Sequence, residues 1–139
     1  VAPFEVAAIV MELVEGPTLQ EWIVANPQRS NRTIAGLLHQ VASGLVAIHA
    51  TGIVHGDVKS TNILIDATVP AADGVPAIKI IDFGLSRLLE VTAKHAGPQG
   101  GTAEYLAPEF WSEEPPSPDV RSDIWSFGVL MYELLTGTL

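Results

Sequence analysis

The feature that constrains this sequence most is a pair of polar segments, each lying next to short runs of isoleucine and leucine. Residues 55–62 are polar and are followed by the apolar run 63–65, and the second polar segment begins at Asp82, directly after the run 78–81. Apolar runs this short, rich in β-branched residues, are typical of buried strands. We expect the two runs to pair as a hairpin, which brings Asn62 and Asp82 side by side.

The polar side chains of these segments indicate a particular chemistry. Asp57, Lys59 and Asn62 lie within one short loop, and Asp82 lies at a strand end in front of Phe83-Gly84. A carboxylate, an amine and an amide presented together can bind a hydroxyl, a phosphate and a metal. Asn and Asp oxygens suit Mg²⁺, which prefers a few protein oxygens together with substrate phosphates. The sequence therefore predicts a metal–phosphate site.

The first half of the chain predicts a strand followed by two helices. Residues 6–14 form an apolar run too short for a typical helix, which we interpret as a buried strand. Thr18 is suited to cap a short helix over 19–25, with Glu21 completing a capping box. Ser30 or Asn31 can cap a longer helix that ends near Thr51-Gly52. One face of this longer helix is apolar at spacings of three and four: Ile34, Leu37, Leu38, Val41, Leu45 and Ile48.

The second half predicts loops and one apolar helix. Residues 66–76 are expected to form a surface loop between the paired strands, and residues 85–101 a long loop. A helix is predicted over 119–135, with Gly137 at its end. We expect this helix to be buried nearly all round, because its apolar residues lie on more than one face: Ile124, Trp125, Phe127, Val129, Leu130, Met131, Leu134 and Leu135.

Composition excludes several kinds of function. A chain of 139 residues is long enough for one compact domain, and 16 acidic against 7 basic residues give a net charge of −9. That charge argues against a nucleic-acid surface, which needs clustered Lys and Arg. The absence of cysteine excludes disulfides, thiolate zinc sites and a catalytic thiol. No membrane segment is expected, since Ser126, Gly128 and Glu133 interrupt the apolar run near the end. Both ends look cut, so we expect a fragment.

Three motifs occur in order along the chain. They are His55-Gly56-Asp57-Val58-Lys59-Ser60-Thr61-Asn62, then Asp82-Phe83-Gly84, then Ala107-Pro108-Glu109 preceded by residues 101–106. Together they resemble the signature set of eukaryotic-type protein kinases, in which the catalytic loop is followed by D-F-G and A-P-E. One triplet alone arises by chance, whereas three in order with this spacing do not. The resemblance covers essentially the whole chain.

The resemblance implies an α+β, protein-kinase-like fold. Residues 1–16 would be the last strand of the N-lobe and the hinge, and residues 17–139 would be the C-lobe through its central buried helix. By this resemblance Asp57 is the catalytic base that accepts the substrate hydroxyl proton, and Lys59 balances the charge of the transferred phosphoryl group. Asn62 and Asp82 would hold the Mg²⁺ ions.

The resemblance also assigns an ATP pocket. Met11 is similar to the gatekeeper before the hinge, and Glu12 and Val14 would offer backbone groups to adenine. Leu64 would pack beneath the adenine ring. The implied cofactors are ATP and Mg²⁺, and the implied partner is a protein substrate.

Three further residues would support the site. Thr102 would lie near the catalytic loop and shape the peptide site, Glu109 is the acid of the A-P-E motif, and Asp123 would brace the catalytic-loop backbone. Gly56 departs from the pattern, because the family has an Arg there that pairs with a phosphorylated activation-loop residue. We therefore expect constitutive activity or another mode of control.

Other parts of the family pattern do not occur in these 139 residues: there is no G-x-G-x-x-G loop, no V-A-I-K lysine and no partner Glu. A pseudokinase that acts as a binding or scaffolding module therefore stays open, as does a truncated remnant without function. Lys59 and the sequence 101–109 favour a Ser/Thr over a Tyr kinase, and residues 58–64 resemble tyrosine-kinase-like and receptor-like Ser/Thr kinases. The expected location is the cytoplasm or the cytoplasmic side of a membrane protein.

Overall fold

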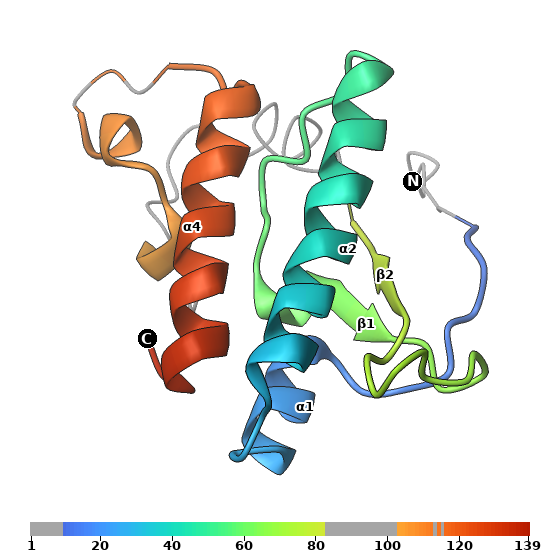
Figure 1. Ribbon diagram of the computed structural model, residues 1–139. Helices are drawn as coiled ribbons and strands as arrows, with labels where there is room; N and C mark the ends of the chain where they lie inside the picture. The colour runs from blue at the N-terminus through green and yellow to red at the C-terminus, as the bar shows by residue number, and fades with distance from the viewer. Residues whose placement is uncertain (1–9, 83–102, 113, 115) are drawn as a thin grey trace, which may run out of the picture.

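The structure is a computed structural model that describes residues 10–82, 103–112, 114 and 116–139. It combines helices with one small sheet, consistent with part of a protein-kinase-like α+β fold (Figure 1). In chain order the elements are α1 (Leu19–Ala25), α2 (Asn31–Ala50), the 3₁₀ turn η1 (Ser60–Asn62), β1 (Ile63–Ile65), β2 (Ile78–Ile80), the 3₁₀ turns η2 (Ala103–Tyr105) and η3 (Pro108–Trp111), and α4 (Val120–Thr136).

The predicted caps of the first two helices are confirmed. The Thr18 hydroxyl accepts a hydrogen bond from the backbone N–H of Glu21, and the Glu21 carboxylate accepts one from the backbone N–H of Thr18, which completes the capping box. Ser30 rather than Asn31 caps α2, since its hydroxyl accepts from the backbone N–H of Thr33. The chain turns at each cap because these side chains satisfy N–H groups that the helix cannot.

The predicted hairpin is also confirmed. β1 and β2 pair antiparallel with Ile63 opposite Ile80 and Ile65 opposite Ile78. The pairing continues one residue further, because the Ile81 N–H donates to the Asn62 carbonyl at 2.9 Å. This register places Asp82 directly beyond the position opposite Asn62.

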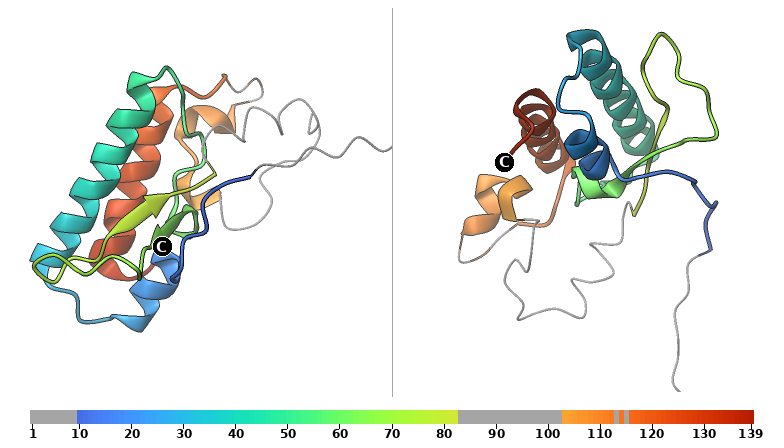
Figure 2. Two further views of the ribbon diagram at one scale, coloured as in Figure 1. Left: turned by 90° about the vertical axis from the view of Figure 1, so that its right-hand side faces the viewer. Right: turned by 90° about the horizontal axis from the view of Figure 1, so that it is seen from below.

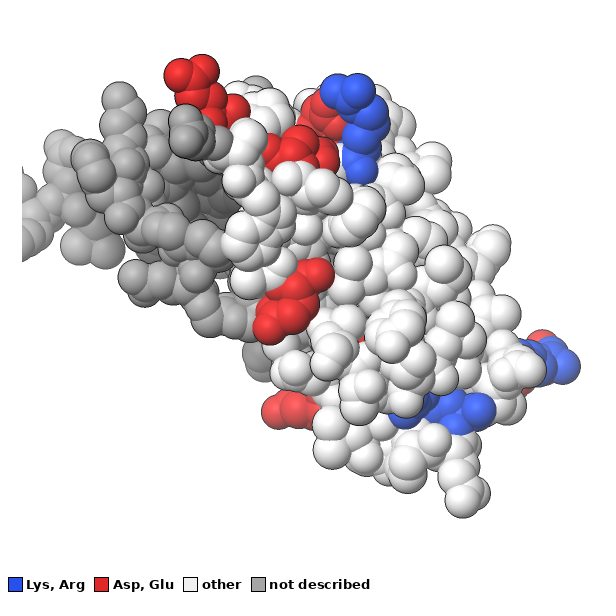
Figure 3. Space-filling model, turned by 90° about the vertical axis from the view of Figure 1, so that its left-hand side faces the viewer, with Lys and Arg blue, Asp and Glu red and all other residues white. Residues whose placement is uncertain are grey.

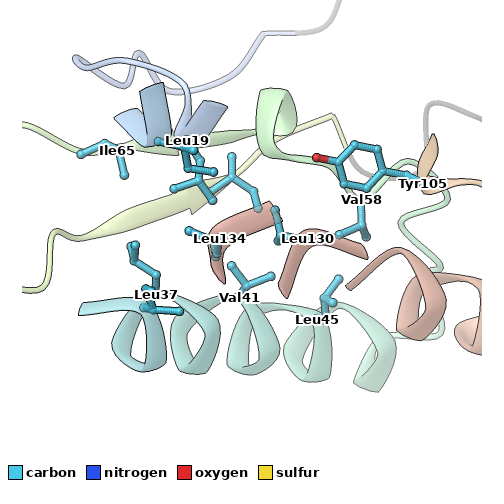
Figure 4. Close-up of a cluster of buried hydrophobic side chains, with 12 residues drawn as sticks. Leu19, Leu37, Val41, Leu45, Val58, Ile65, Tyr105, Leu130 and Leu134 are labelled. Atoms are coloured by element: carbon cyan, nitrogen blue, oxygen red, sulfur yellow. The ribbon is translucent and has the colours of Figure 1, made fainter. Parts of the chain in front are cut away.

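The core lies between the hairpin and two long helices. α2 and α4 run antiparallel beside one another, and the hairpin crosses them (Figures 1 and 2). Figure 4 shows the apolar side chains of these elements converging. The buried cluster contains Leu19, Ile23, Ile34, Leu37, Val41, Leu45, Val58, Ile63, Ile65, Tyr105, Leu130 and Leu134.

The prediction that the last helix is buried nearly all round is wrong. α4 begins and ends where expected, with Asp119 as its N-cap and Gly137 in a left-handed conformation at its C-cap. Its outer face is exposed, including Trp125 at 47% and Tyr132 at 57%. Among the described residues α2 and η2 pack against α4, and they leave Trp125 and Tyr132 uncovered. Figure 3 shows that much of the surface on this side of the molecule carries no charged side chain.

The predicted strand over 6–14 is not observed where the structure describes it. Residues 6–9 lie outside the described residues, and residues 10–14 have no regular secondary structure. Val10 is 96% exposed and Leu13 is 87% exposed. A strand needs a neighbour to pair with along its length, and none of the described strands pairs with these residues. The predicted loop at 85–101 lies outside the described residues.

One described helix, α2, is long and apolar enough to cross a membrane by length and composition alone. In the structure α2 buries Leu37, Val41 and Leu45 against β2 and α4, as a core helix does. That packing gives its apolar face a role inside this domain.

Candidate active site

Three of the predicted site residues are hydrogen-bonded to one another. The Lys59 Nζ lies 2.8 Å from the Asp57 Oδ2, and the Asn62 Nδ2 donates to the same oxygen at 2.8 Å and to the Asp57 carbonyl at 2.9 Å. The side chain of Asp57 is 29% exposed and that of Lys59 is 17% exposed. A carboxylate is thus held at the surface with a cation and an amide beside it.

The backbone conformation explains why these two side chains meet. Lys59 is extended, with φ −162° and ψ 163°. Successive side chains of extended backbone point to opposite faces. Val58 and Ser60 are accordingly buried at 2% and 1% exposure, whereas Asp57 and Lys59 share the outer face.

Asp82 lies at the end of the hairpin that begins at Asn62. Its backbone has φ 60°, and among the described residues Asp73 is the one other non-glycine with positive φ. The left-handed region costs most residues energy, although Asp tolerates it better than most. Strained backbone of this kind persists where the surrounding structure imposes it, and it occurs often at functional sites.

The Asp123 carboxylate holds the start of the catalytic loop. It is 1% exposed, and it accepts hydrogen bonds from the backbone N–H groups of His55 at 2.9 Å and Gly56 at 2.8 Å. Its Oδ2 also lies 2.7 Å from the Nε2 of His49, at the end of α2. A buried carboxylate is tolerated because donors surround it. This geometry is what the expected bracing role requires.

Gly56 and His55 fit the conformation of this loop. Gly56 has φ 77°, a left-handed conformation that glycine adopts without the cost a side chain would add. The His55 ring is fully buried, and its Nδ1 accepts a hydrogen bond from the Asp57 N–H at 3.2 Å. Burial lowers the pKa of His55, against the opposing effect of the carboxylates of Asp123 and Asp57. The neutral ring therefore supports the backbone of Asp57.

A buried polar network beneath the loop was missed by the sequence analysis. The Ser60 hydroxyl donates to the Glu133 Oε1 at 2.9 Å, and the Tyr105 hydroxyl donates to the other oxygen of the same carboxylate in a short hydrogen bond. Burial, and then the hydrogen bond to Glu133, raise the pKa of Tyr105 well above its usual range. The available signal was Glu133 itself, an acid within an otherwise apolar helix.

The predicted adenine-contacting residues are spread over two segments. Met11, Glu12 and Val14 lie in the irregular segment before α1, and the Glu12 carboxylate lies 3.0 Å from the Lys79 Nζ. Leu64 lies on β1, opposite Lys79 in the hairpin register. The segment is tied to β1 because the Pro17 carbonyl accepts from the backbone N–H of Ile65 at 2.9 Å, and the Glu15 carbonyl accepts from that of Ala67 just after the strand. These residues therefore lie along one edge of the hairpin.

The two remaining predicted residues are not brought into the site by the described contacts. Thr102 lies outside the described residues. Glu109 is exposed at the start of η3, and its carbonyl accepts from the Ser112 hydroxyl at 2.9 Å. The nearby Arg121 pairs with Asp119 at 2.6 Å. This pairing raises the pKa of Arg121, and Glu109 contributes to the same shift.

The chemistry of the donor set fits Mg²⁺. Asn62 turns its amide nitrogen toward Asp57, so its carbonyl oxygen is the atom that can bind a cation. Asp82 supplies a carboxylate at the same end of the hairpin. Two protein oxygens with phosphate oxygens and water are the ligands that Mg²⁺ prefers.

Comparison with known proteins finds similarity to one family over nearly the whole chain. A family model described as the protein kinase domain matches residues 3–139. The serine/threonine-protein kinase pkn2 of Myxococcus xanthus is 42% identical over 96% of this chain, and PknL of Mycobacterium tuberculosis is 42% identical over 93%. PrkC of Bacillus subtilis is 36% identical over 94% of the chain. The chain spans only 16%, 30% and 19% of the lengths of these relatives.

Proposed function

The chain belongs to the protein kinase family, and from this premise we propose that the protein containing it transfers the γ-phosphoryl group of ATP to Ser or Thr hydroxyls of protein substrates. The observation that carries the proposal is the contact among Asp57, Lys59 and Asn62, with Asp82 at the adjoining end of the hairpin. The names of the relatives support serine and threonine as the acceptors.

Each side chain of this group has a distinct task. The Asp57 carboxylate lies 2.8 Å from the Lys59 Nζ and its side chain is 29% exposed, so it can accept the proton of an incoming hydroxyl. The Lys59 ammonium, held 2.8 Å from that carboxylate, offsets negative charge on the phosphoryl group. The amide of Asn62 fixes the orientation of Asp57 through two hydrogen bonds. Positioning of this kind supplies much of the catalysis in phosphoryl transfer.

Nucleotide binding is proposed for the adjoining edge of the hairpin. Asn62 and Asp82 would hold Mg²⁺, and the ion would supply positive charge that offsets the charge of the nucleotide phosphates. The backbone of the segment that contains Met11, Glu12 and Val14 would meet adenine, with Leu64 beneath it. Thr102 and Glu109 would shape the peptide-binding side. Because the reaction uses ATP, we propose that this domain lies on the cytoplasmic side of any membrane.

The test is phosphate transfer by the full-length protein with Asp57→Asn. Loss of the base at this position should lower kcat by about 10²–10⁴-fold, while binding of nucleotide and Mg²⁺ persists. Asp66→Asn is the matched control, because Asp66 follows β1 and, among the described residues, its carboxylate accepts hydrogen bonds from Thr68 in its own turn. Radiolabelled ATP and acceptor peptides with Ser, Thr or Tyr identify the acceptor.

A pseudokinase is the alternative, and the same assay separates it. The full-length wild type would then bind nucleotide or a partner without transferring phosphate, and Asp57→Asn would not alter that binding. Equal transfer by the wild type and Asp57→Asn would contradict the role of Asp57 outright.

A further inference from the structure

Ser60 occupies a position that the proposed catalytic roles leave unexplained. It follows Lys59 and precedes Asn62 by two residues, yet it is only 1% exposed. It is the first residue of η1, in which the Asn62 N–H donates to the Lys59 carbonyl at 3.0 Å. Any movement of Ser60 therefore moves the residues on both sides of it.

Two hydrogen bonds fix Ser60. Its hydroxyl donates to the Glu133 Oε1 at 2.9 Å, and its backbone N–H donates to the Tyr105 hydroxyl at 3.4 Å. The two hydroxyl oxygens lie 3.2 Å apart. Tyr105 in turn donates to the second Glu133 oxygen. Figure 4 shows the Tyr105 hydroxyl directed toward the helical turn at the end of the loop. The three residues form a closed ring of hydrogen bonds, which includes the backbone N–H of Ser60.

The ring depends on Ser60 because Glu133 is buried. Glu133 is 5% exposed and Tyr105 is 4% exposed. A buried carboxylate needs donors in place of water. No Lys or Arg of the described residues forms an ion pair with Glu133, so the hydroxyls of Ser60 and Tyr105 are the donors that the structure records for it.

We propose that Ser60 is a positioning residue for phosphoryl transfer. Because Glu133 holds the Ser60 side chain in the interior, the Lys59 side chain points to the surface and contacts Asp57. The position of Ser60 also fixes the position of Asn62 at the end of η1. Through its hydrogen bond to Tyr105 it also couples the catalytic loop to η2, the segment next to the A-P-E motif. This proposal rests on the proposed function and assigns a residue on which that function depends.

The experiment compares Ser60→Ala with the wild type in the full-length protein. We expect kcat to fall about tenfold or more, because displacement of a catalytic group by an ångström can cost a factor of 10², while KM for ATP changes less than threefold. Ser43→Ala, the same substitution on the exposed side of α2, should leave both constants unchanged. Thermal melting confirms that each variant is folded.

A double-mutant cycle distinguishes a shared network from separate structural damage. If Ser60 and Tyr105 act through one ring, Ser60→Ala combined with Tyr105→Phe should lower kcat much less than the product of the single effects. Multiplying effects would overturn the proposal, as would wild-type kcat in Ser60→Ala.

Hydrogen exchange keeps this test independent of activity. In Ser60→Ala the amides of residues 57–62 should exchange at least about tenfold faster, whereas exchange in α2 and α4 should be unchanged. If the wild-type protein transfers no phosphate, the proposed function fails, and the exchange measurement still decides whether Ser60 holds the loop. Unchanged exchange at 57–62 would show that it does not.

Discussion

The buried carboxylate of Asp123 offers the most direct test of how the catalytic loop is held. Its two oxygens accept from the backbone N–H groups of His55 and Gly56 at 2.9 and 2.8 Å. Asp123→Ala would leave the buried N–H of His55 and the partly buried N–H of Gly56 without this acceptor. Each such loss costs about 1–3 kcal/mol, so the loop should be destabilised by about 2–6 kcal/mol. A domain of this size is stable by about 5–15 kcal/mol, so the loop can open while the domain stays folded.

Asp123→Asn should have a smaller effect. The amide keeps one acceptor oxygen but turns an NH₂ group toward a backbone N–H, so about one of the two hydrogen bonds is lost, at about 1–3 kcal/mol. The contact to the His49 Nε2 at 2.7 Å also loses its charged acceptor. The expected order of loop stability is therefore wild type, then Asp123→Asn, then Asp123→Ala.

The assay is amide hydrogen exchange of the full-length protein over residues 53–58. A loss of 2 kcal/mol corresponds to about 30-fold faster exchange, since about 1.4 kcal/mol is a factor of ten. Asp66→Ala is the control, because Asp66 bonds within an exposed turn and should leave 53–58 unchanged. Exchange in Asp123→Ala within threefold of the wild type, in a folded protein, would refute this account of the brace.

Two further predictions concern pH and helix packing. Burial places the pKa of His55 below its unfolded value of about 6.5. The unfolded chain therefore takes up a proton first, and the stability of the fold should fall as pH drops below about 6.5. His55→Phe should reduce the difference in melting temperature between pH 7.5 and pH 5.5, and an unchanged difference would contradict this. A Cβ at Gly36 would lie 2.6 Å from a methyl of the stiff Val75, and at Gly44 2.6 Å from the end of the flexible Ile80. In urea unfolding Gly36→Ala should therefore lose about 1–2 kcal/mol, whereas Gly44→Ala should stay near the wild type because alanine favours helix by about 1 kcal/mol; equal losses would count against this reasoning.

Local structure was predictable because its causes are local. The capping box of Thr18 and Glu21 is visible as a three-residue spacing, and the structure confirms it. The hairpin followed from two short apolar runs, and its register then placed Asn62 next to the end of β2. The proximity of Asn62 and Asp82 along the hairpin needed no knowledge of the rest of the fold.

The parts that sequence reasoning missed depend on contacts between distant segments. Ser60 and Glu133 are 73 residues apart, and Tyr105 and Glu133 are 28 apart. No periodicity within either segment predicts which hydroxyl meets which carboxylate. The burial of α4 was overestimated for a similar reason, because an apolar residue such as Trp125 or Tyr132 indicates a face that can be covered without showing what covers it.

The spacing of polar residues on α4 explains the conformation of the catalytic loop. Asp123 and Glu133 lie ten residues apart, which is about 15 Å along a helix. They hold the backbone of Gly56 and the side chain of Ser60, which are four residues apart and span at most about 14 Å when extended. The loop is therefore expected to be extended between these two points, and Lys59 is indeed extended.

A straight segment fixes which side chains reach the surface. Because extended backbone alternates its side chains, burial of Val58 and Ser60 places Asp57 and Lys59 together on the outer face. Removal of one residue from this segment would turn every following side chain to the opposite face. The carboxylate and the ammonium thus meet at 2.8 Å because a rigid helix sets the distance that the loop has to cross.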